Sequence, residues 1–434
     1  MSPVEQRGDE RRALGWIGKD TAMDESAPRP DSDSELERFL VKLGSELLAS
    51  GESAQSVVES LRAVGRAAGS DRTEVLVFPR ALLVETDEAS GRRVELAIME
   101  PRDQRFDRDL AVHDLAVRAE RAEISPADGC REIDEIRAMP PRYRLPVRVF
   151  GGAVLAVGVA LMLQPTAMTV VLAAVLGVLV AGLQEIAVPE LQVIMPTLTA
   201  FVAGLIVFGF ADAIGSANPI RVLVAPLIML MPGLMILTST IELAAGEMVV
   251  GAGRFIAGLM QVLLLAVGIV AAANLIGIGE QTLLDQPVAR FGPWAPVLGL
   301  FVLNLGFRLR WGTPARLMPL IAVVQVVAYG VEVAASASFS PEMSGFFGAV
   351  VMTPLAMLLA RRFGGLPTMV LLIPGLWVLL PGAAGLIGLA GLVEGSTQVA
   401  GDVLMTTLTT VVSIGLGVLV GSSVVRTGER VVQH

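Results

Sequence analysis

Apolar residues dominate the chain from about residue 147 onward, in runs long enough to cross a bilayer. A membrane helix needs about twenty mostly apolar residues, and ten runs approach that length. We expect spans at 147–164, 166–184, 192–211, 220–241, 255–277, 294–310, 315–333, 343–360, 366–389 and 402–424. The pattern therefore predicts a mainly α, polytopic helical membrane protein with ten spans.

The first third of the chain follows a different pattern. Residues 1–34 are polar and are expected to form a disordered tail. Beyond them, apolar positions recur first at helical and then at strand spacing. The expected helices cover about 36–48, 57–64, 107–120 and 126–138, and the expected strands 74–78, 81–85 and 93–98. Residues 35–141 are thus predicted to form a small α+β domain.

The ten expected spans fall into two halves that repeat. An offset of 149 residues carries the start of the first span, 147, onto 296, and the start of the third, 192, onto 341. The same offset carries Pro165 onto Pro314, Pro232-Gly233 onto Pro381-Gly382, and Gly246 onto Gly395. Because five spans per half is an odd number, the halves, 142–290 and 291–434, are predicted to be inverted repeats.

Charge supports this division and gives an orientation. Residues up to Leu145 contain 22 Lys and Arg and 30 Asp and Glu, whereas the rest contain 11 and 12. The net charge of −9 lies mostly in the N-terminal domain, so a nucleic-acid partner is not expected. Most Lys and Arg residues near the span ends are expected on the same side of the membrane as that domain. Both termini are therefore predicted to be cytoplasmic in a multi-pass protein of the cell membrane.

Two expected spans contain proline–glycine breaks, Pro232-Gly233 in the fourth and Pro381-Gly382 in the ninth. A proline removes a backbone donor and frees a carbonyl, and such groups persist in a membrane only where protein or a water-filled cavity satisfies them. Paired breaks in two halves are typical of a transporter's binding site. We therefore predict a mid-membrane substrate site at these four residues, with two packing kinks as the alternative.

Hydroxyl groups follow the first break. Thr238, Ser239 and Thr240 are candidates for contact with substrate, although membrane Ser and Thr also bond back to their own helix. Thr353, Asn304 and Gln325 lie deeper inside expected spans. For these three, contact with substrate and hydrogen bonds between neighbouring helices are both open.

Carboxylates inside the spans are candidates for proton coupling. An ionised side chain at mid-bilayer costs about 2.5–3.5 kcal/mol on insertion scales, so an acid there is a functional hypothesis. Glu242 is the first candidate, followed by Glu332, Asp212 and Glu185. All four lie close to predicted span ends, where a carboxylate can instead reach water.

Other chemistry has little support in the sequence. Cys130 is the one cysteine, and with His113 it is too little for a standard zinc site. The chain has no Ser/His/Asp or Cys/His set and no Gly-Lys-Ser/Thr phosphate loop. We expect no bound metal, no cofactor and no enzymatic activity. His113 is expected to lie on a helix surface. A membrane-anchored enzymatic or regulatory module is an alternative, but it leaves the duplicated breaks unexplained.

These segments together resemble the threonine/serine exporter family over about residues 35–424. The resemblance rests on the hairpin 47–57, on Pro232-Gly233 followed by Glu242 and Arg254, and on the Pro-Gly pairs of 373–382. It implies a ten-span secondary exporter of threonine and serine, driven by the proton motive force, with a cytoplasmic N-terminal domain. Glu242 stands where the family's usual residue is aspartate, which keeps the charge and lengthens the reach.

The substrate expected from this reading is a small zwitterionic hydroxy-amino acid, with a proton and the lipid bilayer as the other partners. Some members of the family are split into two chains at the repeat boundary and have been linked to succinate export, so dicarboxylate export is the alternative. A dicarboxylate site predicts a buried Arg or Lys, and none is expected beyond the span ends. The near absence of basic residues inside the spans favours the zwitterion, and the oligomeric state is left open.

Overall fold

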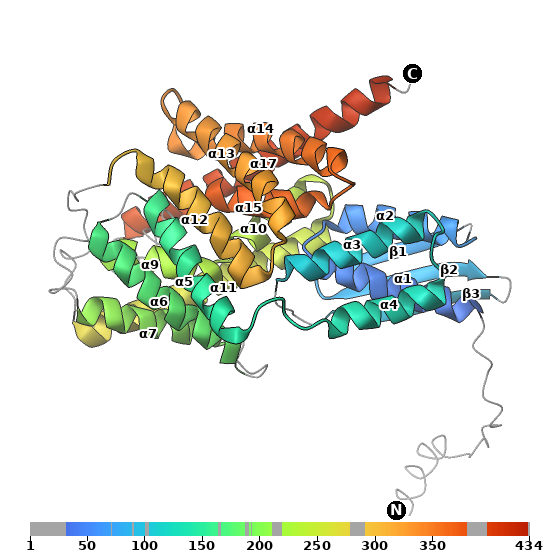
Figure 1. Cartoon of the computed structure of the whole chain (residues 1–434), viewed down its shortest axis with the longest axis horizontal. Helices are drawn as coiled ribbons and strands as arrows, with labels where there is room; N and C mark the ends of the chain where they lie inside the picture. The colour runs from blue at the N-terminus through green and yellow to red at the C-terminus, as the bar shows by residue number, and fades with distance from the viewer. Residues whose placement is uncertain are drawn as a thin grey trace, which may run out of the picture.

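The computed structural model describes residues 32–70, 72–88, 91–99, 104–163, 166–186, 191, 193–210, 219–277, 291–379 and 397–432. A small domain built by the N-terminal third lies beside a larger helical body (Figure 1). Most of the described chain is helical. This arrangement is that of a polytopic helical membrane protein with an N-terminal α+β domain.

The N-terminal domain contains four helices and an antiparallel sheet of order β1-β2-β3. Its buried side chains, among them Phe39, Leu61 and Leu82, join the helices to one face of the sheet. Each helix and strand predicted for this region is present. Their bounds are α1 Ser32–Ala49, α2 Ala54–Ala67, β1 Thr73–Phe78, β2 Ala81–Glu88, β3 Gly91–Ile98, α3 Phe106–Glu120 and α4 Pro126–Ala138.

The helical body consists of two sets of helices. The first set is α5 Leu145–Met162, α6 Ala167–Ile186, α7 Met195–Gly209, α9 Pro219–Leu227, η3 Ile228–Leu230, α10 Gly233–Ala244 and α11 Met248–Ile276. The second set is α12 Trp294–Trp311, η5 Ala315–Leu317, α13 Met318–Ser336, α14 Pro341–Arg362, α15 Thr368–Leu379 and α17 Thr397–Val432.

Several of these helices meet the length and apolarity that a membrane span requires. Within the described residues, 6 helices qualify, and the bent pair Val222–Leu230 with Gly233–Ala244 brings the number to 7. Two others, α7 and α15, are apolar but shorter. The chain is therefore a multi-pass membrane protein, and the count of ten spans stays a prediction.

The order of helices repeats along the body. Helices α5, α9 and α11 begin at residues 145, 219 and 248, and α12, α15 and α17 begin at 294, 368 and 397. Each start in the second set follows its counterpart by the offset found in the sequence. Neighbours repeat as well, because α7 packs on α11 as α14 packs on α17, and α6 packs on α9 as α13 packs on α15.

The two sets meet where α5 crosses α12, and glycines bring these helices close together. A Cβ atom built on Gly158 would lie 2.5 Å from the backbone nitrogen of Leu303, and one on Gly306 would lie 2.7 Å from the Leu155 Cα. Gly151 approaches the backbone of Arg310 in the same way. Because the contacts run in opposite order along the two helices, α5 and α12 are antiparallel.

The N-terminal domain and the helical body share part of a core. Phe106, the first residue of α3, is completely buried against Phe307 and Trp311 of α12, with ring centroids 6.3 Å away in each case. Pro79, between β1 and β2, lies against Gly253 near the start of α11. The domain is therefore packed on the body through apolar contacts, which the sequence pattern did not predict.

Candidate functional site

The predicted break in the fourth span is present. The chain bends by 58° between η3 and α10, at Met231 and Pro232. Helix α10 begins at Gly233 with no side chain capping its N-terminus. The carbonyl of Leu230 accepts a hydrogen bond of 2.7 Å from the side-chain amide of Gln261. A carbonyl at the break is thus satisfied by α11, as a buried backbone group requires.

The hydroxyls that follow the break bond to their own helix. Thr238 donates to the carbonyl of Met235 at 3.1 Å, and Ser239 and Thr240 both donate to the carbonyl of Ile236, at 2.6 and 2.9 Å. The structure therefore shows the back-bonded alternative weighed for these residues.

Glu242 lies near the end of α10 with 1% of its side chain exposed. Its Oε1 accepts a hydrogen bond of 2.6 Å from Arg254 of α11 and one of 3.4 Å from the backbone N–H of Ala54. Its Oε2 is buried without a hydrogen-bond partner among the described residues. Only one of the two carboxylate oxygens therefore has hydrogen-bond partners in the described chain. Burying the other oxygen without one costs free energy.

A cavity of about 310 Å³ opens beside Glu242, between the N-terminal domain and helices α10, α14, α15 and α17. Glu52, Ser53 and His113 line it from the domain, and Thr353 lines it from α14. Thr353 is 1% exposed, and its hydroxyl also has no partner within the described chain. Two buried polar atoms without partners on one cavity indicate a place for water or a polar ligand.

The structure brings only some of the predicted site residues together. Glu242 and Thr353 share the cavity, whereas Pro232, Gly233 and the three hydroxyl residues after them are not among the residues that line it. Glu332 lies half-buried on α13, also away from that lining. Asp212, Pro381 and Gly382 fall outside the described residues.

The other polar candidates bond to neighbouring helices. Glu185 accepts hydrogen bonds from Arg148 of α5 and Arg310 of α12. Asn304 donates to the carbonyl of Met318 at 2.9 Å, and Gln325 donates to that of Pro374 at 3.2 Å. For the two amides the observed bonds are those between neighbouring helices.

His113 is not simply a surface residue of its helix, as the sequence suggested. Its Nε2 lies 3.0 Å from the carbonyl of Gly365 in the helical body, and its Nδ1 lies 3.6 Å from Glu52. Burial by itself lowers the pKa of His113, but the hydrogen bond and charge of Glu52 and the Gly365 carbonyl outweigh burial and raise the pKa above 6.5. The ring of His113 therefore links the domain to the body.

The contacts made by the N-terminal domain are the functional feature that sequence reasoning missed. Ser53 caps helix α2 by accepting a hydrogen bond of 3.2 Å from the N–H of Ser56. This cap places the Ala54 N–H, at the positive end of the helix dipole, next to Glu242. A serine before a helix is a common N-cap, but nothing local to Ser53 indicates which residue of the helical body meets the capped end.

The His113 contact gives a testable pH dependence. A group whose pKa is higher in the folded state adds stability that is fully present below its unfolded pKa and is lost as the pH rises through the folded pKa. We expect wild-type protein to exceed His113→Gln in Tm by about 2 °C at pH 5.5 and by little at pH 8.5. Thermal unfolding of both across this range measures the difference. Glu52→Gln, which removes the charge of the His113 partner, is the matched variant. An equal difference in Tm between wild type and His113→Gln at both pH values would contradict the contact.

Comparison with known families agrees with the resemblance described above. Residues 38–276 match one family model of the threonine/serine exporter, and residues 296–424 match a second. Together the two models cover most of the chain. No curated protein and no solved structure was found to match it.

Proposed function

The chain belongs to the threonine/serine exporter family, and from that premise we propose that it exports threonine and serine in exchange for protons, with Glu242 as the coupling residue. The observation that carries the proposal is the state of Glu242. It is buried, one of its oxygens accepts a hydrogen bond from Arg254, and the other has no hydrogen-bond partner in the described part of the chain. A carboxylate that is costly to keep charged and borders a cavity is suited to take up and release a proton.

The substrate site belongs, in this proposal, to the breaks of the fourth and ninth spans. The uncapped N-terminus of α10 at Gly233 offers backbone N–H groups and a positive dipole to the carboxylate of an amino acid. Pro381-Gly382, which lies outside the described residues, is the sequence counterpart of this break in the second half. Thr353, whose hydroxyl has no partner among the described residues, is the side chain best suited to meet the hydroxyl of threonine or serine.

We further propose ten spans arranged as inverted repeats. The close contacts of α5 with α12 support the inversion because these two helices, which begin 149 residues apart, cross in antiparallel directions. Gly158 meets Leu303, and Gly306 meets Leu155. A two-fold axis across the pair would relate two equivalent helices in this way. If these helices cross the bilayer, that axis lies in the membrane plane.

The N-terminal domain is proposed to lie in the cytoplasm and to cover the cavity beside Glu242. Glu52, Ser53 and His113 reach that cavity from the domain, and the domain is held there by the buried Phe106. A membrane-impermeant thiol reagent should therefore not label Glu59→Cys in intact cells that carry Cys130→Ser. It should label Leu283→Cys, and the reverse pattern would overturn the proposed orientation.

Dicarboxylate export keeps one observation in its favour. Arg148 and Arg310 lie at helix ends, as expected, yet their side chains are only 20% and 10% exposed. They share the carboxylate of Glu185, so buried positive charge is present where the two sets of helices meet.

Transport by the purified full-length protein in lipid vesicles distinguishes the two substrates. We expect an imposed pH gradient to drive uptake of labelled threonine and serine, but not of succinate, above the level in empty vesicles. A gradient that drives succinate and not threonine would replace the first function with the second. Threonine movement that is equal with and without the gradient would remove proton coupling.

A further inference from the structure

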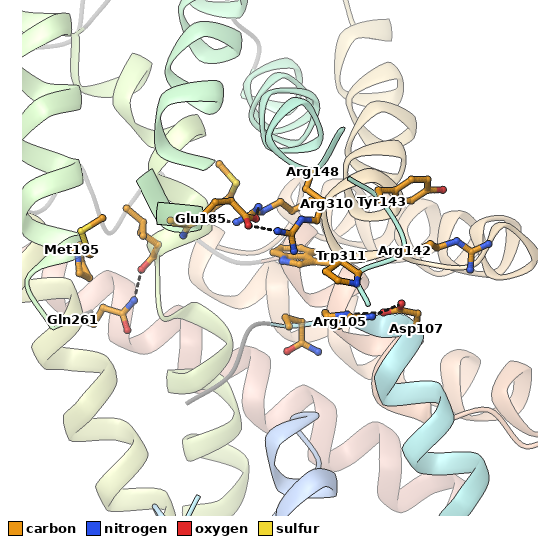
Figure 2. A pocket seen from close by; sticks show the side chains of 17 residues that line it. Arg105, Asp107, Arg142, Tyr143, Arg148, Glu185, Met195, Gln261, Arg310 and Trp311 are labelled. Atoms are coloured by element: carbon orange, nitrogen blue, oxygen red, sulfur yellow. Dashed lines mark hydrogen bonds and ion pairs between the residues drawn. The ribbon is translucent and has the colours of Figure 1, made fainter. Parts of the chain in front are cut away.

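A second cavity, of about 470 Å³, lies between the N-terminal domain, the first set of helices and α12. Its walls come from α5, α6, α7, η3, α11 and α12 and from the connector that precedes α5. Figure 2 shows Arg148 and Arg310 converging on Glu185 in this cavity, with Arg105 beside Asp107 on the other side of Trp311. The proposed transport mechanism does not use this cavity.

Positive charge exceeds negative charge on its walls. Arg105 is balanced by Asp107 at 2.9 Å, whereas Arg148 and Arg310 both donate to the one carboxylate of Glu185. Arg310 also donates to the side chain of Gln184 at 3.0 Å. Arg142, on the connector, is exposed and makes no ion pair with a described residue. The two guanidinium groups on the single Glu185 carboxylate leave a partly buried surplus of positive charge, which costs free energy unless an anion compensates it.

The size and the lining of the cavity fit a small organic molecule. Its volume falls in the range of small-molecule sites, about 300–1,000 Å³. Met195, Met229 and Trp311 provide apolar walls, and Gln261 provides an amide. Guanidinium groups bind carboxylates through paired, charge-assisted hydrogen bonds. Since Gln261 also holds the carbonyl of Leu230, an occupant would lie next to the break of the fourth span.

We propose that this cavity binds the carboxylate of a small organic acid, with Arg148 as its main partner and with Glu185 as the internal carboxylate that competes for the same guanidinium groups. The site itself does not depend on proton coupling at Glu242. Only the choice of threonine as one ligand to be tested rests on the proposed function.

Binding to the purified full-length protein in nanodiscs of zwitterionic lipid tests the site by titration calorimetry. Threonine and succinate are the ligands tested, and threonine amide, which keeps the ammonium but lacks the carboxylate, is the control ligand. We expect saturable binding of at least one of the two acids and none of the amide. Loss of a charge-assisted contact in Arg148→Gln should weaken that binding at least about tenfold. The control variant is Arg308→Gln, on α12 but outside the cavity lining, and it should leave the binding of the acid unchanged.

Glu185→Gln gives the prediction of opposite sign. Removing the internal carboxylate frees both guanidinium groups, so the acid should bind several-fold more tightly than to wild type. A purely structural role for the cluster predicts weaker binding in both variants, and that result would overturn the proposal. Absence of binding of either acid would also overturn it. If anionic phospholipid stabilised the protein, neither acid bound, and the stabilisation were lost in Arg148→Gln, the site would be assigned to a lipid phosphate instead. Binding of succinate without transport of threonine would leave this inference standing and remove the proposed substrate.

Discussion

Glu242→Gln is expected to reduce threonine uptake driven by a pH gradient to the level of empty vesicles. An amide has nearly the shape of the carboxyl group, and its oxygen can still accept from Arg254 and from the Ala54 N–H. The amide cannot, however, take up or release a proton at the pH of the cell. The change therefore removes coupling without removing the contacts that hold α10, α11 and α2 together.

Exchange of labelled for unlabelled threonine across the vesicle membrane separates coupling from binding, because exchange needs no net movement of protons. We expect Glu242→Gln to retain exchange. Glu332→Gln is the matched control, since Glu332 is a second membrane carboxylate that lies away from the cavity. Normal gradient-driven uptake in Glu242→Gln would rule out Glu242 as the coupling residue. Loss of coupling in Glu332→Gln alone would transfer the role to α13.

Local patterns predicted the helices, the strands and the break at Pro232, since each depends on residues close in sequence. The 149-residue offset of the repeat was also visible, because it compares two stretches of the same chain. Glu242 was a candidate because it lies at the end of an apolar run, but its burial was left open, since a carboxylate at a span end can instead reach water. These features need no knowledge of which distant residues meet.

Long-range contacts account for most of what the sequence did not predict. The Ala54 N–H and Glu242 are 188 residues apart, and His113 and Gly365 are 252 apart. No periodicity relates such positions, so the close fit of the N-terminal domain over the cavity was not foreseen. The burial of Arg148 and Arg310 has the same origin. Both lie at helix ends, where exposure was expected, but the connector and the domain line the same cavity and limit their contact with water.

Gly158→Ala is expected to destabilise the protein by about 2–4 kcal/mol, because the new methyl group would meet backbone atoms of α12 that cannot move aside. The nearest are the nitrogen and Cα of Leu303, at 2.5 and 2.7 Å. The gain of about 1 kcal/mol in helix propensity when alanine replaces glycine offsets only part of this loss. The effect is measured as the midpoint of thermal unfolding in detergent, monitored through the fraction of protein that remains monodisperse.

Gly306 tests the same helix pair from the other side. Gly306→Ala should also lower the midpoint, because its methyl group would meet the Leu155 backbone. The double variant should lose less than the two single losses added together, since either methyl group already separates the helices. Gly182→Ala on α6 is the control, since no atom lies within 4 Å of the added Cβ. Stability of Gly158→Ala equal to that of Gly182→Ala would show that the two helices are not in contact. Unchanged stability in Gly306→Ala would argue against the close antiparallel packing that supports the proposed inverted repeat.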